Sequence, residues 1–265
     1  MKQIVMKKKV LVLMPLAALL SVASWLVYTK VLNHSLCLAA SEEDTGAVAR
    51  FLKRGANPNA VGVVPSPNLN SDTLPQSALS LAVSSPPTKG MRGIGPTYVT
   101  EYDRALPATA LLIQAGADVN ARDEDGSSPL IEARSPRMVK FLLAHGAKVD
   151  LWGENGVTAL MAHANYFSVG ETDALLAAGA DTNARDGHGQ TALMFALQQS
   201  TDPDFDPTTS PGQVSVLTLG VVKRLIAAGA DVNARDNEGK TALGYALDNK
   251  QTDSVRFLKK IGARR

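Results

Sequence analysis

The sequence predicts an all-α solenoid of about six stacked helix-turn-helix units, preceded by one hydrophobic N-terminal helix. The first observation is a recurring junction that opens with Gly-Ala and continues with Asp and Asn. The second is the regular step between copies of this junction. The third is composition: 45% of the 265 residues are hydrophobic but only 5% are aromatic. Such a composition favours Ala and Leu packed between neighbouring units over one thick aromatic core.

One complete junction between two helices lies in residues 225–243. Gly229 follows an apolar run, where a helix end needs the left-handed conformation that glycine adopts without strain. Asn233 and Asp236 are residue types whose side chains bond their own backbone in turns. Thr241 can cap the following helix with its hydroxyl. This stretch therefore predicts a helix end, an extended finger and a helix start.

The first half of this junction recurs along the chain. A Gly-Ala pair opens it at six places, with the glycines at Gly55, Gly116, Gly146, Gly179, Gly229 and Gly262. Successive glycines are 61, 30, 33, 50 and 33 residues apart. The two long steps predict insertions between helices, at about 84–107 and about 200–216.

A period near 33 residues with this junction resembles the ankyrin repeat. The resemblance covers residues 34–265 and implies stacked helix pairs whose turns project to one side as fingers. One such unit cannot bury its apolar face alone, so contacts between neighbours supply the stability. The expected organisation is a separate segment at 1–30 and an ankyrin-repeat domain at 34–265.

The N-terminal segment contains 19 residues without a charge, Val10–Tyr28. This is just long enough to span a bilayer as a helix, and the lysines at 7–9 place the N-terminus in the cytoplasm. We expect a single-pass inner-membrane anchor, which would be the only membrane contact, with the repeats in the periplasm of a bacterium-like cell. The alternative is a signal peptide cleaved near Ser21–Ala23, which would leave a soluble periplasmic domain.

Charge and cysteine content limit the partners. Five of the 27 basic residues lie in the first 30 positions, which leaves 22 against 25 acidic residues in the remainder. No basic field is left to hold a nucleic acid backbone. Cys37 is the single cysteine, so an intrachain disulfide is impossible, and its apolar neighbours predict a small buried side chain.

Candidate binding residues follow from the resemblance, because ankyrin proteins commonly contact partners through variable finger positions. These positions are Arg122, Glu124, Asp125, Ser127, Trp152, Glu154, Asn155, Val157, Arg185, Gly187, His188, Gln190, Arg235, Asn237, Glu238 and Lys240. Trp152 is the strongest candidate, since interfaces draw energy from a few aromatic and arginine anchors. Arg122, Arg185 and Arg235 hold one shared position, so hydrogen bonding between fingers is an open alternative for them.

Catalysis needs a convergent set of groups, and the sequence offers none. No metalloprotease, paired-cysteine or nucleophile-elbow motif is present, so we expect no enzyme activity, no metal and no cofactor. His163 stands where other units have alanine, which predicts a buried, hydrogen-bonded histidine rather than a ligand. Asp202, Asp204 and Asp206 alternate in the second insertion but lack the glycine and glutamate of a calcium loop.

The expected function is a protein–protein interaction module of the cell envelope. The chain resembles periplasmic bacterial ankyrin proteins, some of which support a partner enzyme such as a catalase. An immunity or chaperone-like protein that masks a partner is the first alternative. A hydrolase or other metal-dependent enzyme built on the two insertions is the second.

Overall fold

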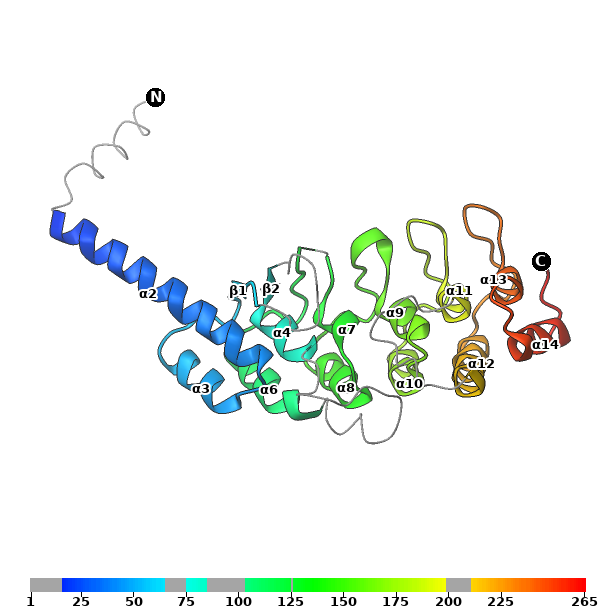
Figure 1. The fold of residues 1–265 in the computed structure, drawn as a ribbon, viewed down its shortest axis with the longest axis horizontal. Helices are drawn as coiled ribbons and strands as arrows, with labels where there is room; N and C mark the ends of the chain where they lie inside the picture. The colour runs from blue at the N-terminus through cyan, green and yellow to red at the C-terminus, as the bar shows by residue number, and fades with distance from the viewer. Residues whose placement is uncertain (1–15, 65–74, 85–102, 125, 199–210) are drawn as a thin grey trace, which may run out of the picture.

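The computed structural model describes residues 16–64, 75–84, 103–124, 126–198 and 211–265. They form an elongated array of helices that starts with the helix at residues 16–41 at one end and finishes with the helix at residues 252–260 at the other (Figure 1). The helices pack in consecutive pairs: α2 (Leu16–Ser41) with α3 (Thr45–Lys53), α4 (Ala78–Ser84) with α6 (Leu106–Gln114), α7 (Pro129–Glu132) with α8 (Pro136–Ala144), α9 (Ala159–Asn165) with α10 (Val169–Ala177), α11 (Ala192–Leu197) with α12 (Pro211–Ala227), and α13 (Ala242–Asp248) with α14 (Thr252–Lys260). This mostly helical array agrees with the predicted fold class.

The first helices of the pairs form one row, in which each packs on the next from α2 to α13. The loops between pairs project to one side of this row (Figure 1). At the base of the first loop, β1 (Val61–Gly62) and β2 (Gln76–Ser77) form a short antiparallel ladder. The array therefore presents its loops side by side along one edge.

Glycine ends the second helix of each pair, as predicted. Gly179 has φ +84° and Gly229 has φ +96°, and an added Cβ would meet no atom within 4 Å at either position. Backbone conformation alone therefore requires glycine there. The next N–H closes the helix end, from Ala180 to the Leu175 carbonyl at 3.1 Å and from Ala230 to the Leu225 carbonyl at 3.0 Å.

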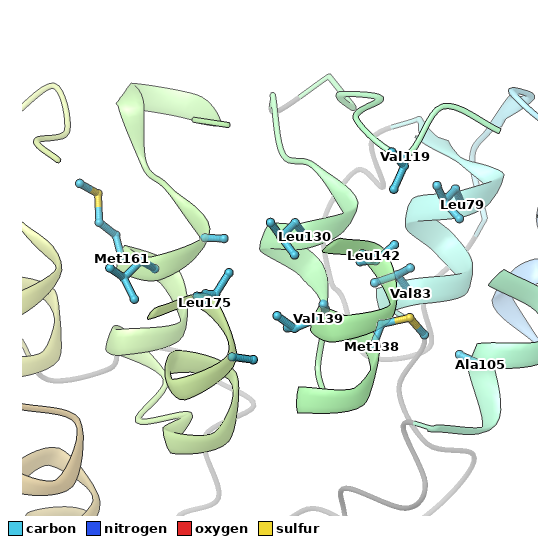
Figure 2. Close-up of a cluster of buried hydrophobic side chains, with 14 of the residues drawn as sticks. Leu79, Val83, Ala105, Val119, Leu130, Met138, Val139, Leu142, Met161 and Leu175 are labelled. Carbon is cyan, nitrogen blue, oxygen red and sulfur yellow. The ribbon is translucent and has the colours of Figure 1, made fainter. Parts of the chain in front are cut away.

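The core consists of aliphatic side chains buried between neighbouring pairs. Leu79, Leu130, Leu142 and Leu175 come from four different helices and are at most 2% exposed (Figure 2). Each fully buried leucine contributes roughly 1.5–3 kcal/mol relative to an exposed one. Neighbouring units thus supply each other's apolar contacts, as a solenoid requires.

The N-terminal prediction of a membrane anchor with a periplasmic repeat domain is wrong. Among the residues that the structure describes, no helix is long and apolar enough to cross a bilayer. Helix α2 continues past the predicted span into polar Lys30, Asn33 and His34, and then buries Leu36 in the first unit. The lysines at 7–9 and residues 10–15 of the predicted span lie outside the described residues.

The signal-peptide alternative is also not supported, because the predicted cleavage point falls inside the continuous helix α2. The membrane-anchor and signal-peptide predictions both placed the repeats in the periplasm, and the described residues do not support that placement. Helix α2 joins what the sequence divides into an N-terminal segment and a first repeat helix.

Most of both predicted insertions lies outside the described residues, at 85–102 and 199–210. Their C-terminal ends are ordered differently from the expectation. The first ends in a 3-10 turn, η1 (Asp103–Ala105), that leads into α6. The second ends in helix, because α12 begins at Pro211 rather than after residue 216.

Candidate interaction surface

Four successive loops share one backbone frame. We call them finger 3 (residues 121–127), finger 4 (151–157), finger 5 (184–190) and finger 6 (234–240). Each finger is closed by an N–H···O=C bond across its base: Asp123 to Ser127 at 3.0 Å, Gly153 to Val157 at 2.8 Å, Asp186 to Gln190 at 3.0 Å, and Asp236 to Lys240 at 3.0 Å. Equivalent positions of different fingers are therefore repeated along the array.

An aspartate organises fingers 5 and 6 from inside. Oδ1 of Asp186 accepts backbone N–H bonds from His188 at 3.0 Å and Gln190 at 2.7 Å. Asp236 makes the same pair of bonds in finger 6. Finger 4 has Gly153 at this position, so it turns through the 3-10 segment η2 (Glu154–Gly156) and is closed by backbone bonds alone.

An asparagine ladder ties consecutive units together beneath the fingers. Asn183 donates from Nδ2 to the Gly229 carbonyl at 3.1 Å and accepts the Asp231 N–H on Oδ1 at 2.8 Å. Asn59 and Asn120 make the same pair of contacts with the units that follow them. Asp150 replaces asparagine at the start of finger 4. It accepts from the Asp181 N–H at 2.9 Å but has no amide to donate.

Two of the three finger arginines bond backbone oxygens further along the array. Arg185 donates from Nη2 to the Arg235 carbonyl at 2.5 Å, and Arg235 donates to the Arg265 carbonyl at 2.9 Å. For Arg185 the alternative of finger-to-finger bonding is confirmed, whereas Arg235 bonds its own finger and the segment after Gly262. Arg122 differs, because its guanidinium lies 4.3 Å from the centroid of the Trp152 ring. Trp152 itself holds the arginine position in finger 4.

Trp152 is the most unusual residue of this surface. It is 56% exposed, although large apolar side chains are usually buried. Glu154 and Asn155 of the same finger and Glu124 of finger 3 are also exposed. The stacked Arg122 holds the Trp152 ring in place. An exposed cation–π contact of this kind contributes about 0.5–1 kcal/mol. The arrangement offers a positioned aromatic surface to a partner.

Other predicted binding residues are engaged within the fold. Gln190 donates to the Tyr245 hydroxyl, which donates to Oδ2 of Asp236 at 2.8 Å. Lys240 pairs with Asp248 at 2.7 Å and lies 4.0 Å over the Tyr245 ring. Burial, followed by the bond to Asp236, raises the pKa of Tyr245 to about 12. Burial alone would raise the pKa of Asp236, but its bonds from Tyr245 and from backbone N–H groups lower it.

The remaining predicted binding residues are either bonded within the fold or exposed to solvent. Ser127 is half-buried and donates to Glu132 at 2.6 Å, and Val157 is also half-buried. Asn237 joins finger 6 to finger 5, donating from N to the His188 carbonyl at 2.9 Å and from Nδ2 to the Gly187 carbonyl at 3.0 Å. The side chains of His188 and Glu238 are exposed, whereas Asp125 lies outside the described residues.

The structure adds residues that sequence reasoning missed. Arg264 and Arg265 follow the last Gly-Ala pair and lie beside finger 6, where the Arg264 N–H donates to Asn233 at 2.8 Å. Their register after Gly262 was the available signal, because it places them where the next unit's ladder begins.

Two buried groups have the environments that the sequence predicts. His163 is 2% exposed, with Nε2 3.2 Å from the Leu130 carbonyl, and burial lowers its pKa to about 4. Cys37 is buried, and burial raises the pKa of its thiol to about 11. Within the described ranges, no three His, Cys, Asp or Glu side chains are grouped to hold a metal ion. Asp202, Asp204 and Asp206 lie outside those ranges.

Comparison with known proteins identifies the repeats. Residues 172–264 match the family model described as ankyrin repeats (3 copies). The chain is 33% identical over 112 residues to the mouse B-cell lymphoma 3 protein homolog, which covers 41% of this chain and 25% of that protein. It is 39% identical over 89 residues to ankyrin repeat domain-containing protein SAT10 of Stachybotrys chartarum, covering 32% of this chain and 5% of the relative.

A third relative is the chicken nuclear factor NF-kappa-B p105 subunit, 30% identical over 135 residues, or 44% of this chain and 14% of the relative. The chain thus spans a quarter or less of the length of each of these proteins. The chain carries ankyrin repeats, and repeats of this kind are protein–protein interaction modules.

Proposed function

We propose that this chain is an array of about six ankyrin repeats that binds a protein partner through its fingers, with Trp152 as the main anchor. One observation carries the proposal. A large aromatic side chain is 56% exposed on a finger, at a position where two other fingers use arginine to bond a backbone oxygen further along the array. The substitution gives up a contact within the fold and exposes a surface suited to binding.

Energetic considerations support this choice of anchor. Tryptophan and arginine are enriched among the residues that dominate interfaces, and a tryptophan orders at low entropic cost because it has only two side-chain torsions. Arg122 already stacks on the ring at 4.3 Å, so part of that ordering has occurred before binding. A partner that covers Trp152 and Arg122 together would bury both apolar area and a guanidinium face.

The test is recovery of a partner with the tagged full chain from cells that produce it. Trp152→Ala should lower the affinity for a stoichiometric partner by roughly thirtyfold, the effect of losing an anchor worth about 2 kcal/mol. The amount of partner recovered should fall accordingly. Val216→Ala is the matched control, because Val216 is 69% exposed but lies on α12. Equal recovery with both variants would contradict the proposal.

A further inference from the structure

We infer that the fingers take an extended acidic segment of the partner, with an apolar residue on Trp152 and carboxylates on the arginines of fingers 5 and 6 and on Arg264 and Arg265 beside finger 6. This inference rests on the proposed function and adds the chemistry of the partner. It is carried by a row of four arginines at the C-terminal end of the finger edge: Arg185, Arg235, Arg264 and Arg265.

Two of the four guanidinium groups, those of Arg185 and Arg235, are held in place by backbone oxygens. Arg185 donates one N–H to the Arg235 carbonyl. Arg235 donates to the Gly239 carbonyl at 2.6 Å and to the Arg265 carbonyl at 2.9 Å. A guanidinium has five N–H donors, so each group keeps several for a ligand. Arginines fixed in this way suit carboxylates, which they bind through two parallel hydrogen bonds.

The row has no directly paired carboxylate, although the pKa of Asp248 is lowered first by its bond to Lys240 and, as a smaller effect, by the charge of Arg265. Within the described part of the chain, these four arginines are exposed and form no ion pair. Other basic residues of the array do, such as Arg137 with Asp103 at 2.9 Å and Arg224 with Asp173 at 2.7 Å. In the described part of the chain, four exposed arginines without an ion pair therefore lie at this end of the finger edge, against one, Arg122, at the other end.

The other end of the finger edge has the opposite character. Glu124 of finger 3 and Glu154 of finger 4 are exposed and form no ion pair in the described residues. A partner with carboxylates at fingers 5 and 6 is repelled by these glutamates if it binds in reverse. Like charges brought together in this way set the orientation of binding more than its strength.

An acidic protein segment fits this surface better than a nucleic acid. The exposed Glu238 of finger 6 lies within the basic half, and Glu154 lies beside Trp152. An unbroken phosphate backbone would meet both carboxylates, whereas a peptide can place uncharged residues opposite them. Beyond position 30 the chain also has fewer basic than acidic residues, 22 against 25, as counted from the sequence.

The inference is tested with short fluorescein-labelled peptides bound to the full chain at low salt. One peptide alternates glutamate with glycine and carries a leucine at one end, and its counterpart has lysine for glutamate. The variant is Arg264→Glu with Arg265→Glu, because both side chains are exposed and no hydrogen bond or ion pair of either is found within the described residues. Its control is Lys259→Glu with Lys260→Glu, which makes the same charge change on exposed residues of α14.

We expect the acidic peptide to bind, the arginine variant to weaken it about tenfold, and the lysine control to weaken it less than about twofold. Equal weakening by both variants, binding of the lysine peptide at equal strength, or tighter binding of oligodeoxythymidine would overturn the inference. The proposed function would survive those results if Trp152→Ala still lowers partner recovery. It fails separately if Trp152→Ala has no effect.

Discussion

The contact between fingers 5 and 6 and the contact between fingers 3 and 4 use the same backbone frame but differ in how many polar bonds cross them. Between fingers 5 and 6, Arg185 bridges to a carbonyl, Asn237 donates twice, and Gln190 reaches Tyr245. Between fingers 3 and 4, the side-chain contact found among the described residues is the stacking of Arg122 on Trp152. The regular copies of the repeat are joined by hydrogen bonds between fingers, and the irregular copy exposes the residue that we propose as the anchor for a partner.

The irregularity extends below the fingers. The glycine step from Gly116 to Gly146 is 30 residues, and the first helix of that unit, α7, has only four residues. The Leu130 carbonyl at this short helix is bonded by His163 of α9 instead. His163 stands where neighbouring units have alanine, so one substitution compensates for the shortened helix. Stability at this point of the array therefore depends on a neutral histidine.

The largest expected effect follows from that histidine. Its pKa is lowered from 6.5 to about 4, so an unfolded chain takes up the proton below pH 6.5 while the folded chain does not until about pH 4. Stability is retained above pH 6.5 and falls by about 3 kcal/mol as the pH drops to 4. Urea unfolding at a series of pH values measures this loss.

The control for the acid effect is His163→Ala, because burial raises the pKa of Glu171 and that carboxyl acts in the opposite sense. The variant should be less stable at pH 7 by roughly 1–2 kcal/mol, since it leaves the Leu130 carbonyl unpaired. Its stability should fall less steeply between pH 6.5 and 4 than that of the unchanged chain. Parallel curves would remove His163 as the cause.

The next largest effect concerns the well-connected contact. Tyr245→Phe removes the hydroxyl that bonds Asp236 at 2.8 Å and receives the Gln190 amide. We expect a loss of about 1–2 kcal/mol, because Asp236 is buried and loses a hydrogen bond to its charged form. Thermal and urea unfolding test this. A change within about 0.3 kcal/mol would show that this network does not tie fingers 5 and 6 together.

A reciprocal pair of substitutions sharpens the comparison of the ladder. Asn183→Asp removes the amide that donates to the Gly229 carbonyl, and Asp150→Asn supplies the amide that finger 4 lacks. The first should lower the free energy of unfolding by about 0.5–1 kcal/mol and the second should raise it by a similar or smaller amount. If both substitutions shift the free energy of unfolding in the same direction, the amide donor that Asp150 lacks does not limit stability.

The smallest effect on stability is expected at Trp152. Trp152→Ala should change the free energy of unfolding by less than about 1 kcal/mol, because the ring is 56% exposed and its main contact is the stacked Arg122. The same variant should show the largest loss of partner binding. A loss of stability above about 2 kcal/mol would make Trp152 a structural residue and weaken its assignment as an anchor.

Local rules predicted much of the fold. The helix ends at Gly179 and Gly229 follow from glycine's access to positive φ, and the burial of Cys37 and His163 follows from their apolar surroundings. The start of α12 was predicted too late, although Pro211 at its first position was a readable signal.

The features that the sequence did not predict depend on contacts between residues that are distant in the chain. The apolar run in Val10–Tyr28 has the length of a membrane span, and only the packing of Leu36 and its neighbours shows that the helix continues into the array. The exposed position of Trp152 was predicted from its place in a finger. The arginine row was only partly predicted, because the arginines bond carbonyls 50 and 30 residues further along the chain.

The central claim is that a protein partner contacts the fingers at Trp152. The most direct measurement replaces Trp152 with a photo-crosslinking amino acid in the full chain, irradiates the producing cells and resolves the products by mass. Val216 on α12, which is 69% exposed, receives the same amino acid as the control. We predict one discrete crosslinked species from position 152 and none from position 216. No species from either position, or the same species from both, would contradict the account.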